Sequence, residues 1–330
     1  MARIVALGSA LQDIYLIDRD DFACVEIGGQ SIFSELTIGS KIDIDKVHYD
    51  IGGGGTNAAV CFARTGNETI FMGNLAHDDA GEAVLACLDR ENIDSSYVGY
   101  LRGATGTSVV LLDAKTGERT VLTHRGVSKT FRNFQPDDLD LISPDWLYVT
   151  SLCGDMETLL GFFEKAHAID ARVMFNPGEL ELAESKKLIG LLEDVDVLLV
   201  NKQEASRIVP GVLLTELLGH LAAYCETVLI TDGNMGAIAT DHHETYRLGV
   251  YEQVKVRDAT GAGDAFGSGF LTKWANGAEF SEALQFASAN AASVVQKYGA
   301  KSGILYGDED LHPMPLQAIT ELEFKSTKGR

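Results

Sequence analysis

At residues 258–266 the chain reads Asp258-Ala259-Thr260-Gly261-Ala262-Gly263-Asp264-Ala265-Phe266, and this stretch decides how the remaining sequence is interpreted. Its polar, glycine-rich first half leads directly into small and apolar residues that continue to Trp274, which predicts a loop followed by a buried helix. Asn276 and Gly277 mark the expected end of that helix. The start of such a helix offers unpaired N–H groups and the positive end of the helix dipole, so the sequence predicts an anion site here.

Asp264 directly follows the last glycine of this loop. Because Gly261 and Gly263 have no Cβ, a phosphate can approach the backbone closely. A carboxylate beside a bound phosphate is repelled unless it has a chemical role, and the role that fits is removing a proton from a hydroxyl that attacks the phosphate. The alternative is a capped core helix whose Asp264 only complements the dipole. For an isolated turn of this kind we favour the alternative.

The longer run Asp-x-Thr-Gly-Ala-Gly-Asp-x-Phe changes this balance, because it resembles the C-terminal signature of the ribokinase-like (PfkB) family of carbohydrate kinases. The resemblance implies that Asp264 is the general base of a phosphoryl transfer. It also implies that the N–H groups of Gly261, Ala262 and Gly263 stabilise the charge that develops on the transferring group.

Composition excludes several other classes of function. The 330 residues contain 27 Lys and Arg against 48 Asp and Glu, a formal net charge of −21, which argues against nucleic acid or an anionic membrane surface as a partner. No apolar run reaches the ~20 residues needed to cross a bilayer, and the N-terminus begins as a strand rather than a signal peptide. Five scattered cysteines without a Cys-x-x-Cys pair indicate reduced thiols. We therefore expect a cytoplasmic location.

A second glycine-rich run, Gly52-Gly53-Gly54-Gly55-Thr56-Asn57, opens a helix that is expected to end near Gly66. It fits a loose dinucleotide-binding fingerprint, but the preceding stretch is charged and alternating rather than a buried parallel strand. The other interpretation is close backbone approach to a polar substrate, with the Asn57 amide as a two-way hydrogen-bond partner. The family has a Gly-Gly-x-Gly-x-Asn sugar-binding element at this place. The resemblance therefore implies that Gly53, Gly54 and Asn57 bind substrate.

Asp13 follows the first predicted strand, Ile4–Leu7, and lies where α/β proteins bind ligands, at the carboxyl edge of the sheet. A simple turn aspartate is the alternative, whereas the resemblance implies a contact with substrate hydroxyls. Segments rich in strand patterns, about residues 14–50 and 97–125, indicate a small sheet outside the main one. In the family such a sheet is a lid over the sugar. The resemblance also implies a homodimer formed through this lid.

From Trp146 onward, short apolar strands alternate with helical patterns. We expect strands at residues 146–150, 173–175, 197–200 and 228–230. This alternation predicts an α/β fold with a parallel sheet covered on both faces. Together with the resemblance, it predicts a three-layer α/β/α architecture with a central, mostly parallel sheet, in one ribokinase-like kinase domain over residues 1–330.

Polar residues after two of these strands indicate the nucleotide end of the site. Asn201 and Glu204 form either a plain capping box or a pair that converges on a hydrated Mg²⁺. The family's Asn-x-x-Glu element favours the second interpretation, with Asn201 beside the nucleotide and Glu204 holding Mg²⁺ through water. The further nucleotide-binding residues implied by the resemblance are Thr231, Gly233, Gly236 and Ser288.

The combined prediction is an ATP-dependent phosphotransferase that moves the γ-phosphoryl group of MgATP to a hydroxyl of a sugar, a ribose-like pentose or a hexose. Asp258 and Thr260 match positions that bind K⁺ in some members, so a K⁺ requirement is a hypothesis. The alternatives are a nucleoside kinase of the same family and a non-catalytic sugar or nucleotide sensor. A sensor has no need of Asp264, so the presence of this residue favours an enzyme.

Overall fold

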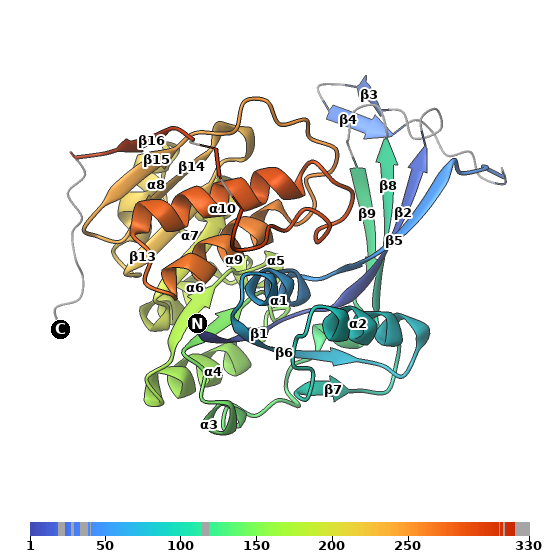
Figure 1. Cartoon of the computed structure of the whole chain (residues 1–330), viewed down its shortest axis with the longest axis horizontal. Coiled ribbons are helices and arrows are strands. Elements are labelled where there is room, and N and C mark those ends of the chain that lie inside the picture. The colour runs from blue at the N-terminus through green and yellow to red at the C-terminus, as the bar shows by residue number, and fades with distance from the viewer. Residues whose placement is uncertain are drawn as a thin grey trace.

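The structure is a computed structural model, and it describes residues 1–18, 24–27, 30–33, 39, 41–113, 119–309, 311–312 and 314–320. A ten-stranded sheet forms its centre, with the strand order β16-β15-β14-β13-β12-β11-β10-β1-β6-β7 (Figure 1). Parallel pairs join β7 (Val98–Tyr100), β6 (Glu68–Leu75), β1 (Arg3–Leu7), β10 (Trp146–Val149), β11 (Arg172–Phe175), β12 (Val197–Asn201) and β13 (Thr227–Thr231). Antiparallel pairs then add β14 (Ala237–Thr240), β15 (Thr245–Leu248) and β16 (Leu316–Ala318).

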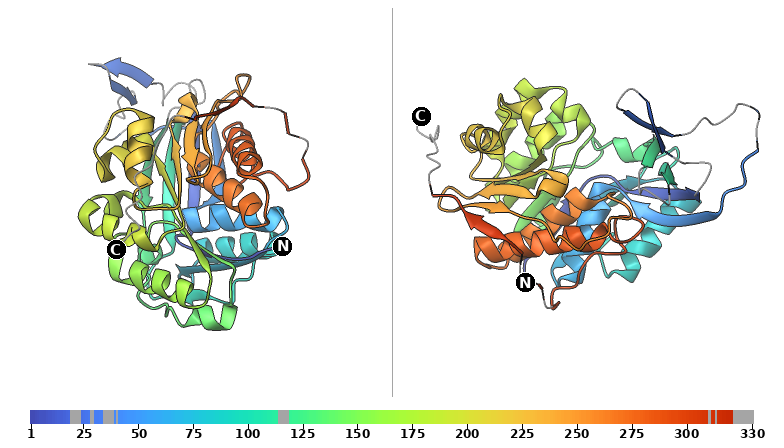
Figure 2. Two further views of the ribbon diagram at one scale, coloured as in Figure 1. Left: turned by 90° about the vertical axis from the view of Figure 1, so that its left-hand side faces the viewer. Right: turned by 90° about the horizontal axis from the view of Figure 1, so that it is seen from above.

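Helices cover both faces of this sheet (Figure 2). Successive residues of a strand point to opposite faces, so on β1 Ile4 and Ala6 enter one apolar core while Val5 and Leu7 enter the other. The first core is closed by α1 (Gly54–Arg64), α2 (Asp79–Arg90), α9 (Ala262–Trp274) and α10 (Phe280–Val294). The second is closed by α3 (Asp138–Ile142), α4 (Met156–Ala168), α5 (Glu179–Leu182), α6 (Ser185–Leu191), α7 (Lys202–Ile208) and α8 (Leu214–Leu221). The predicted three-layer α/β/α fold is confirmed.

Short 3₁₀ helices complete the connections at η1 (Gly126–Lys129), η2 (Leu192–Asp194) and η3 (Gly233–Met235). Among the residues that the structure describes, every helix is too short or too polar to cross a membrane.

A smaller sheet of four strands stands beside the main one, in the order β5-β2-β8-β9 (Figure 1). Its strands are β2 (Leu11–Asp18), β5 (Lys46–Gly52), β8 (Gly106–Asp113) and β9 (Arg119–His124), and a separate hairpin pairs β3 (Cys24–Ile27) with β4 (Gln30–Phe33). The range 97–125 that the sequence predicts for the small sheet includes β7, but this strand pairs with β6 in the main sheet. The reason is that α2 connects these two strands as a crossover, which favours a parallel neighbour. Residues 19–23, 28–29, 34–38, 40 and 114–118 of the two ranges lie outside the described residues.

The two sheets meet at the place where a ligand is expected. Strand β2 begins a few residues after β1 ends, and β5 ends at Gly52, just before α1. Leu11 at the start of β2 pairs with Gly52 at the end of β5. Both connections therefore bring the small sheet to the carboxyl edge of β1, and open α/β sheets bind their ligands at this edge.

Candidate active site

The start of α9 has the geometry that an anion site requires. Gly261 is the N-cap residue, with a φ of 75°, and a Cβ built there would lie 2.4 Å from the Cβ of Ala300. Both the left-handed backbone and the close contact therefore require glycine at this position. The first turn, residues 261–264, lines a cavity of about 190 Å³. The N–H groups at the start of the helix and the positive end of the helix dipole favour an anion in this cavity.

Asp264 lies in this first turn and is held by a residue of another helix. Asn57, on α1, is 4% exposed and its Nδ2 donates a hydrogen bond of 2.8 Å to Asp264 Oδ2. Burial raises the pKa of the Asp264 carboxyl, while the hydrogen bond from Asn57 and the charge of Lys301 act in the opposite direction. A carboxylate in these surroundings is suited to accept a proton from a hydroxyl.

Gly53 and Gly54 bring the start of α1 against Asp264. Gly53 is the N-cap residue of α1, with a φ of 97°, and a Cβ there would lie 2.4 Å from the carbonyl oxygen of Ser9. A Cβ at Gly54 would lie 3.2 Å from Asp264 Oδ1. The glycine turn is therefore packed between the loop after β1 and the carboxylate.

Asp13 adjoins the other end of the same turn. It lies on β2, is 6% exposed, and accepts a hydrogen bond from the hydroxyl of Ser108 on β8. A Cβ at Gly52 would lie 2.0 Å from Asp13 Oδ2, so the carboxylate lies directly against that glycine. Burial raises the pKa of Asp13. The structure thus brings together Asp13, Gly53, Gly54 and Asn57, the four residues that the sequence indicated for substrate.

Lys301 is a buried member of this cluster that the sequence reasoning missed. It lies in the loop after α10, is 4% exposed, and its Nζ donates to Thr56 Oγ1 at 3.0 Å and to Asn57 Oδ1. Burial lowers the pKa of Lys301. The signal that could have found it is a single charged residue within the run Gly299-Ala300-Lys301-Ser302-Gly303, where the other residues are small.

Asn201 and Glu204 lie on the far side of the same cavity of about 190 Å³. They form the capping box of α7: Asn201 N donates to Glu204 Oε2 at 2.8 Å, and Glu204 N donates to Asn201 Oδ1 at 2.9 Å. The capping box and a role toward Mg²⁺ are therefore compatible with each other, since the two residues of the capping box also line the cavity. Burial raises the pKa of Glu204, and the charge of Asp264 adds to this effect.

A divalent cation fits this charge distribution, because it would relieve the unfavourable charge of Glu204 near Asp264. In the described parts of the chain, no group of three or more His, Cys, Asp and Glu side chains forms a metal cluster. Mg²⁺ is compatible with such a site, because it keeps several of its waters and takes few oxygens from the protein.

A second cavity, of about 520 Å³, adjoins the first. It is lined by all four residues expected at the nucleotide: Thr231, Gly233, Gly236 and Ser288. Apolar residues, among them Val250, Val256, Phe266, Ala291 and Ala292, form much of the remaining wall. The two cavities share Thr231 at the end of β13, Ala259 in the loop before α9, and Ala262 and Gly263 in the first turn of α9. Together they suit a ligand with an apolar ring system at one end and an anionic group at the other.

Asp258, expected to bind K⁺ with Thr260, lies beside the cavities and is 1% exposed. Its Oδ1 accepts hydrogen bonds from Thr260 N at 2.9 Å and Thr260 Oγ1 at 2.6 Å, and its Oδ2 accepts one from Gly299 N at 3.1 Å. The Nε of Arg119, on β9, lies 3.6 Å from Asp258 Oδ1. Asp258 therefore joins the loop before α9 to the loop after α10, and a guanidinium group already balances part of its charge.

Comparison with known proteins finds similarity to carbohydrate and nucleoside kinases. A family model described as pfkB family carbohydrate kinase matches residues 1–305. The ribokinase of Lactococcus lactis is 26% identical over 307 residues, which cover 92% of this chain and 94% of that protein. Among solved structures, the nucleoside kinase of Methanocaldococcus jannaschii has a TM-score of 0.76 at 21% identity and covers 93% of this chain and 96% of its own. Arabidopsis thaliana ribokinase, complexed with ribose and ATP, has a TM-score of 0.75 at 23% identity and covers 92% of this chain and 95% of its own.

Proposed function

Because the chain belongs to the pfkB family of carbohydrate kinases, we propose that it moves the γ-phosphoryl group of MgATP to a hydroxyl of a sugar, either a ribose-like pentose or a hexose. The observation that carries the proposal is the position of Asp264. This carboxylate lies in the first turn of α9, in the cavity that suits an anion, and accepts a hydrogen bond from Asn57. A carboxylate repels a phosphate, so its presence where a phosphate is expected requires a chemical role. Removing the proton from the attacking hydroxyl, as a general base, is such a role.

The acceptor side of the reaction uses the turn between the two sheets. Asp13, Gly53, Gly54 and Asn57 bind the acceptor hydroxyls, and Asp264 removes the proton from the hydroxyl that attacks. The start of α9 stabilises the negative charge that develops on the transferring group, through the N–H groups of Gly261, Ala262 and Gly263.

The nucleotide occupies the two adjoining cavities. Asn201 would lie beside its phosphates and Glu204 would hold Mg²⁺ through water. The bound ion would neutralise charge on the phosphates. The apolar wall of the larger cavity takes the base. The residues that line the nucleoside end are Thr231, Gly233, Gly236 and Ser288.

In this proposal the small sheet acts as a lid on a single kinase domain, and two chains form a homodimer through it. What supports a dimer is the set of large apolar side chains exposed on one face of the small sheet: Val47 (47% exposed) and Tyr49 (62%) on β5, and Leu122 (57%) on β9. Light scattering on the purified protein tests this, with a dimer expected for the native chain and a monomer for Tyr49→Lys together with Leu122→Lys. A native monomer would contradict it.

The cytoplasmic location, which rests on the cysteines, stays a prediction.

Binding of K⁺ by Asp258 and Thr260 is a further proposal. It is supported by the buried carboxylate at the meeting of two loops, although Arg119 shares this carboxylate. Rates measured at constant ionic strength in K⁺ and in tetramethylammonium test it. A higher rate in K⁺ supports the site, whereas equal rates contradict it and indicate that Arg119 supplies sufficient positive charge.

The acceptor is tested by measuring ADP release from MgATP across a panel of pentoses, hexoses, sugar acids and nucleosides, with Asp264→Asn as the blank. Turnover on sugars that is lost in the variant supports the proposal. Turnover on nucleosides alone would favour the second candidate, a nucleoside kinase, to which the similarity to the M. jannaschii enzyme points. Binding of a sugar without any turnover would contradict the kinase and favour a sensor.

A further inference from the structure

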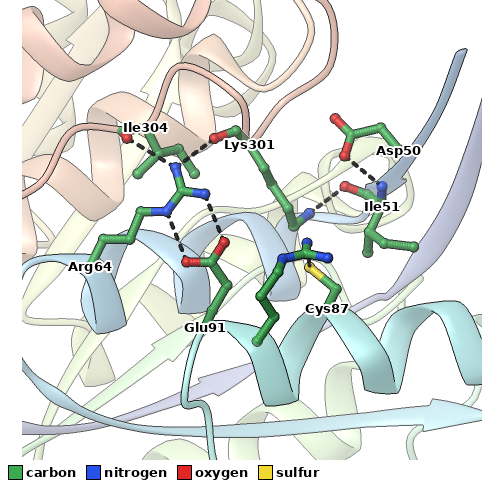
Figure 3. Close-up of polar contacts among 8 residues, drawn as sticks. Asp50, Ile51, Arg64, Cys87, Glu91, Lys301 and Ile304 are labelled. Carbon is green, nitrogen blue, oxygen red and sulfur yellow. Dashed lines mark hydrogen bonds and ion pairs between the residues drawn. The ribbon is translucent and has the colours of Figure 1, made fainter.

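A buried ammonium group lies directly behind the proposed acceptor site. Lys301 Nζ has three protons to donate, and it meets three acceptors: the carbonyl oxygen of Ile51, Thr56 Oγ1 and Asn57 Oδ1. Figure 3 shows this side chain extending from its loop toward Ile51 at the end of β5. Two of its acceptors, Thr56 and Asn57, are successive residues in the first turns of α1.

These contacts determine which way the Asn57 amide faces. A lysine ammonium can only donate, so it must face the amide oxygen, and the amide nitrogen is then directed to Asp264. With the amide reversed, its NH₂ group would face the ammonium, and its oxygen would face the Asp264 carboxylate. Both contacts would be repulsive. Lys301 therefore selects the amide orientation in which Nδ2 donates to Asp264 Oδ2.

The backbone that carries Lys301 is fixed to the same helix as Asn57. Arg64, at the end of α1, donates from Nη1 to the carbonyl oxygens of Lys301 at 2.9 Å and Ile304 at 3.0 Å. Arg64 is itself held by Glu91, with an Nη2–Oε1 distance of 2.7 Å (Figure 3). Helix α1 thus holds the backbone of Lys301 at its last turn and the ammonium group at its first, so the position of Nζ relative to Asn57 is well determined.

Each of the three protons of the ammonium form has an acceptor, although burial lowers the pKa of Lys301. The ionisable groups that face it from the elements around it are Asp50 on β5, Asp13 on β2, Asp264 on α9 and Cys87 on α2. Desolvation disfavours the ammonium form and sets the direction of the pKa shift, whereas the charges of these groups oppose it. A buried ammonium is costly to place in a core, and apolar side chains often replace a whole buried ion pair without loss of stability. This favours a role for the charge and its protons beyond packing.

We propose that Lys301 is a positioning residue for the phosphoryl transfer, acting through the amide of Asn57 on Asp264. With Oδ2 of Asp264 occupied by Asn57, the other oxygen, Oδ1, which faces Gly54, accepts the proton of the attacking hydroxyl. The ammonium charge also helps to keep Asp264 ionised. This inference rests on the proposed function, because it assigns Lys301 a role toward the proposed base.

A kinetic cycle of Lys301→Met, Asn57→Ala and the double variant tests the inference. Met keeps the aliphatic chain but donates no hydrogen bond. We expect Lys301→Met to lower kcat by about 10²-fold, the size of effect that a displaced catalytic group produces, and to move the acid limb of the pH–rate profile to higher pH. In the Asn57→Ala background, Lys301→Met should lower kcat little further. Additive losses in log kcat, or a Lys301→Met enzyme with the native rate and profile, would overturn the proposal.

Lys273→Met is the matched control. Its Nζ donates to Gly307 O at 3.0 Å, away from the proposed site, so this variant should keep the native kcat and acid limb.

The cycle of Lys301→Met, Asn57→Ala and the double variant, followed by urea unfolding, measures the contact between Lys301 and Asn57 without an activity assay. Non-additive denaturation midpoints with no turnover on any acceptor would contradict the proposed function alone, whereas additive midpoints would overturn the inference. If Lys301→Met does not fold, Lys301→Gln, which has a neutral donor one bond shorter, takes its place in both cycles.

Discussion

The amide of Asn57 donates a hydrogen bond of 2.8 Å to the carboxylate of Asp264, although 207 residues separate them in the sequence. The bond joins α1, which begins in the glycine turn beside Asp13, to α9, which begins at the cavity suited to an anion. It is therefore the contact by which the acceptor end and the phosphoryl end of the proposed site are held in a fixed relation.

Replacing Asn57 by Asp should shift the pH dependence of the reaction. The new carboxylate keeps an acceptor for Lys301 but places a like charge beside Asp264, which raises the pKa of Asp264. Because the base must be ionised, the acid limb of the kcat–pH profile should move to higher pH by about one pH unit or more. Asn92→Asp, which adds the same charge in an exposed turn, is the control. An unchanged acid limb in Asn57→Asp would contradict the contact as described.

Replacing Glu204 by Gln should weaken Mg²⁺ activation while keeping the protein folded. Glutamine can still accept the hydrogen bond from Asn201 N, so the capping box survives and Tm should stay close to native. The concentration of Mg²⁺ for half-maximal rate should rise about 10- to 100-fold, as is typical when an outer ligand is lost. Glu216→Gln makes the same change in the cap of α8, away from the cavities, and should have no effect on activation. Native Mg²⁺ dependence in Glu204→Gln would show that Glu204 is only a cap.

Replacing Gly261 by Ala should destabilise the protein and lower its activity together. The φ of 75° is unfavourable for alanine, and the new Cβ would lie 2.4 Å from Ala300 Cβ. We expect a loss of about 1–3 kcal/mol in the free energy of unfolding, measured by urea denaturation. Gly277→Ala has a similar φ of 81° but no atom within 4 Å of its Cβ. It should lose less stability and keep full activity, and equal losses in both variants would contradict the role given to the contact with Ala300.

Replacing Ala292 by Phe should affect the nucleotide and not the acceptor. Ala292, on α10, lines the cavity of about 520 Å³ that is proposed to hold the adenine ring of ATP. The larger side chain would occupy space needed by the adenine ring, so KM for ATP should rise by about 10-fold or more. KM for the acceptor should stay near its native value. Steady-state kinetics with each substrate varied in turn distinguishes the two, and a rise confined to the acceptor would place the nucleotide elsewhere.

Much of the site could be predicted because its parts are local in sequence. The turn that starts α9, the glycine turn before α1 and the capping box at Asn201 each lie within a few residues, and each has a composition that requires its conformation. The parallel sheet with helices on both faces followed from the alternation of short apolar strands and helical patterns. The sequence reasoning therefore found both glycine turns and the helix starts between which the cavities lie.

The features that could not be predicted depend on distant contacts. Lys301 meets Asn57 across 244 residues, and no local pattern indicates which acceptors a single loop lysine will reach. Arg119 lies near Asp258 only because strand β9 of the small sheet comes close to the loop before α9. The sheet to which β7 belongs depends on the crossover made by α2, since a three-residue strand has too little pattern of its own.

The central claim, that Asp264 is the base of a phosphoryl transfer, is tested most directly by single-turnover kinetics of Asp264→Asn with MgATP and the acceptor that the panel identifies. Asparagine keeps the size of the side chain and can hydrogen-bond to Asn57, but it cannot take a proton. The account predicts near-native binding of both substrates by calorimetry and a rate of phosphoryl transfer lowered by about 10²–10⁴-fold. A variant that binds both substrates and transfers the phosphoryl group at a near-native rate would contradict it.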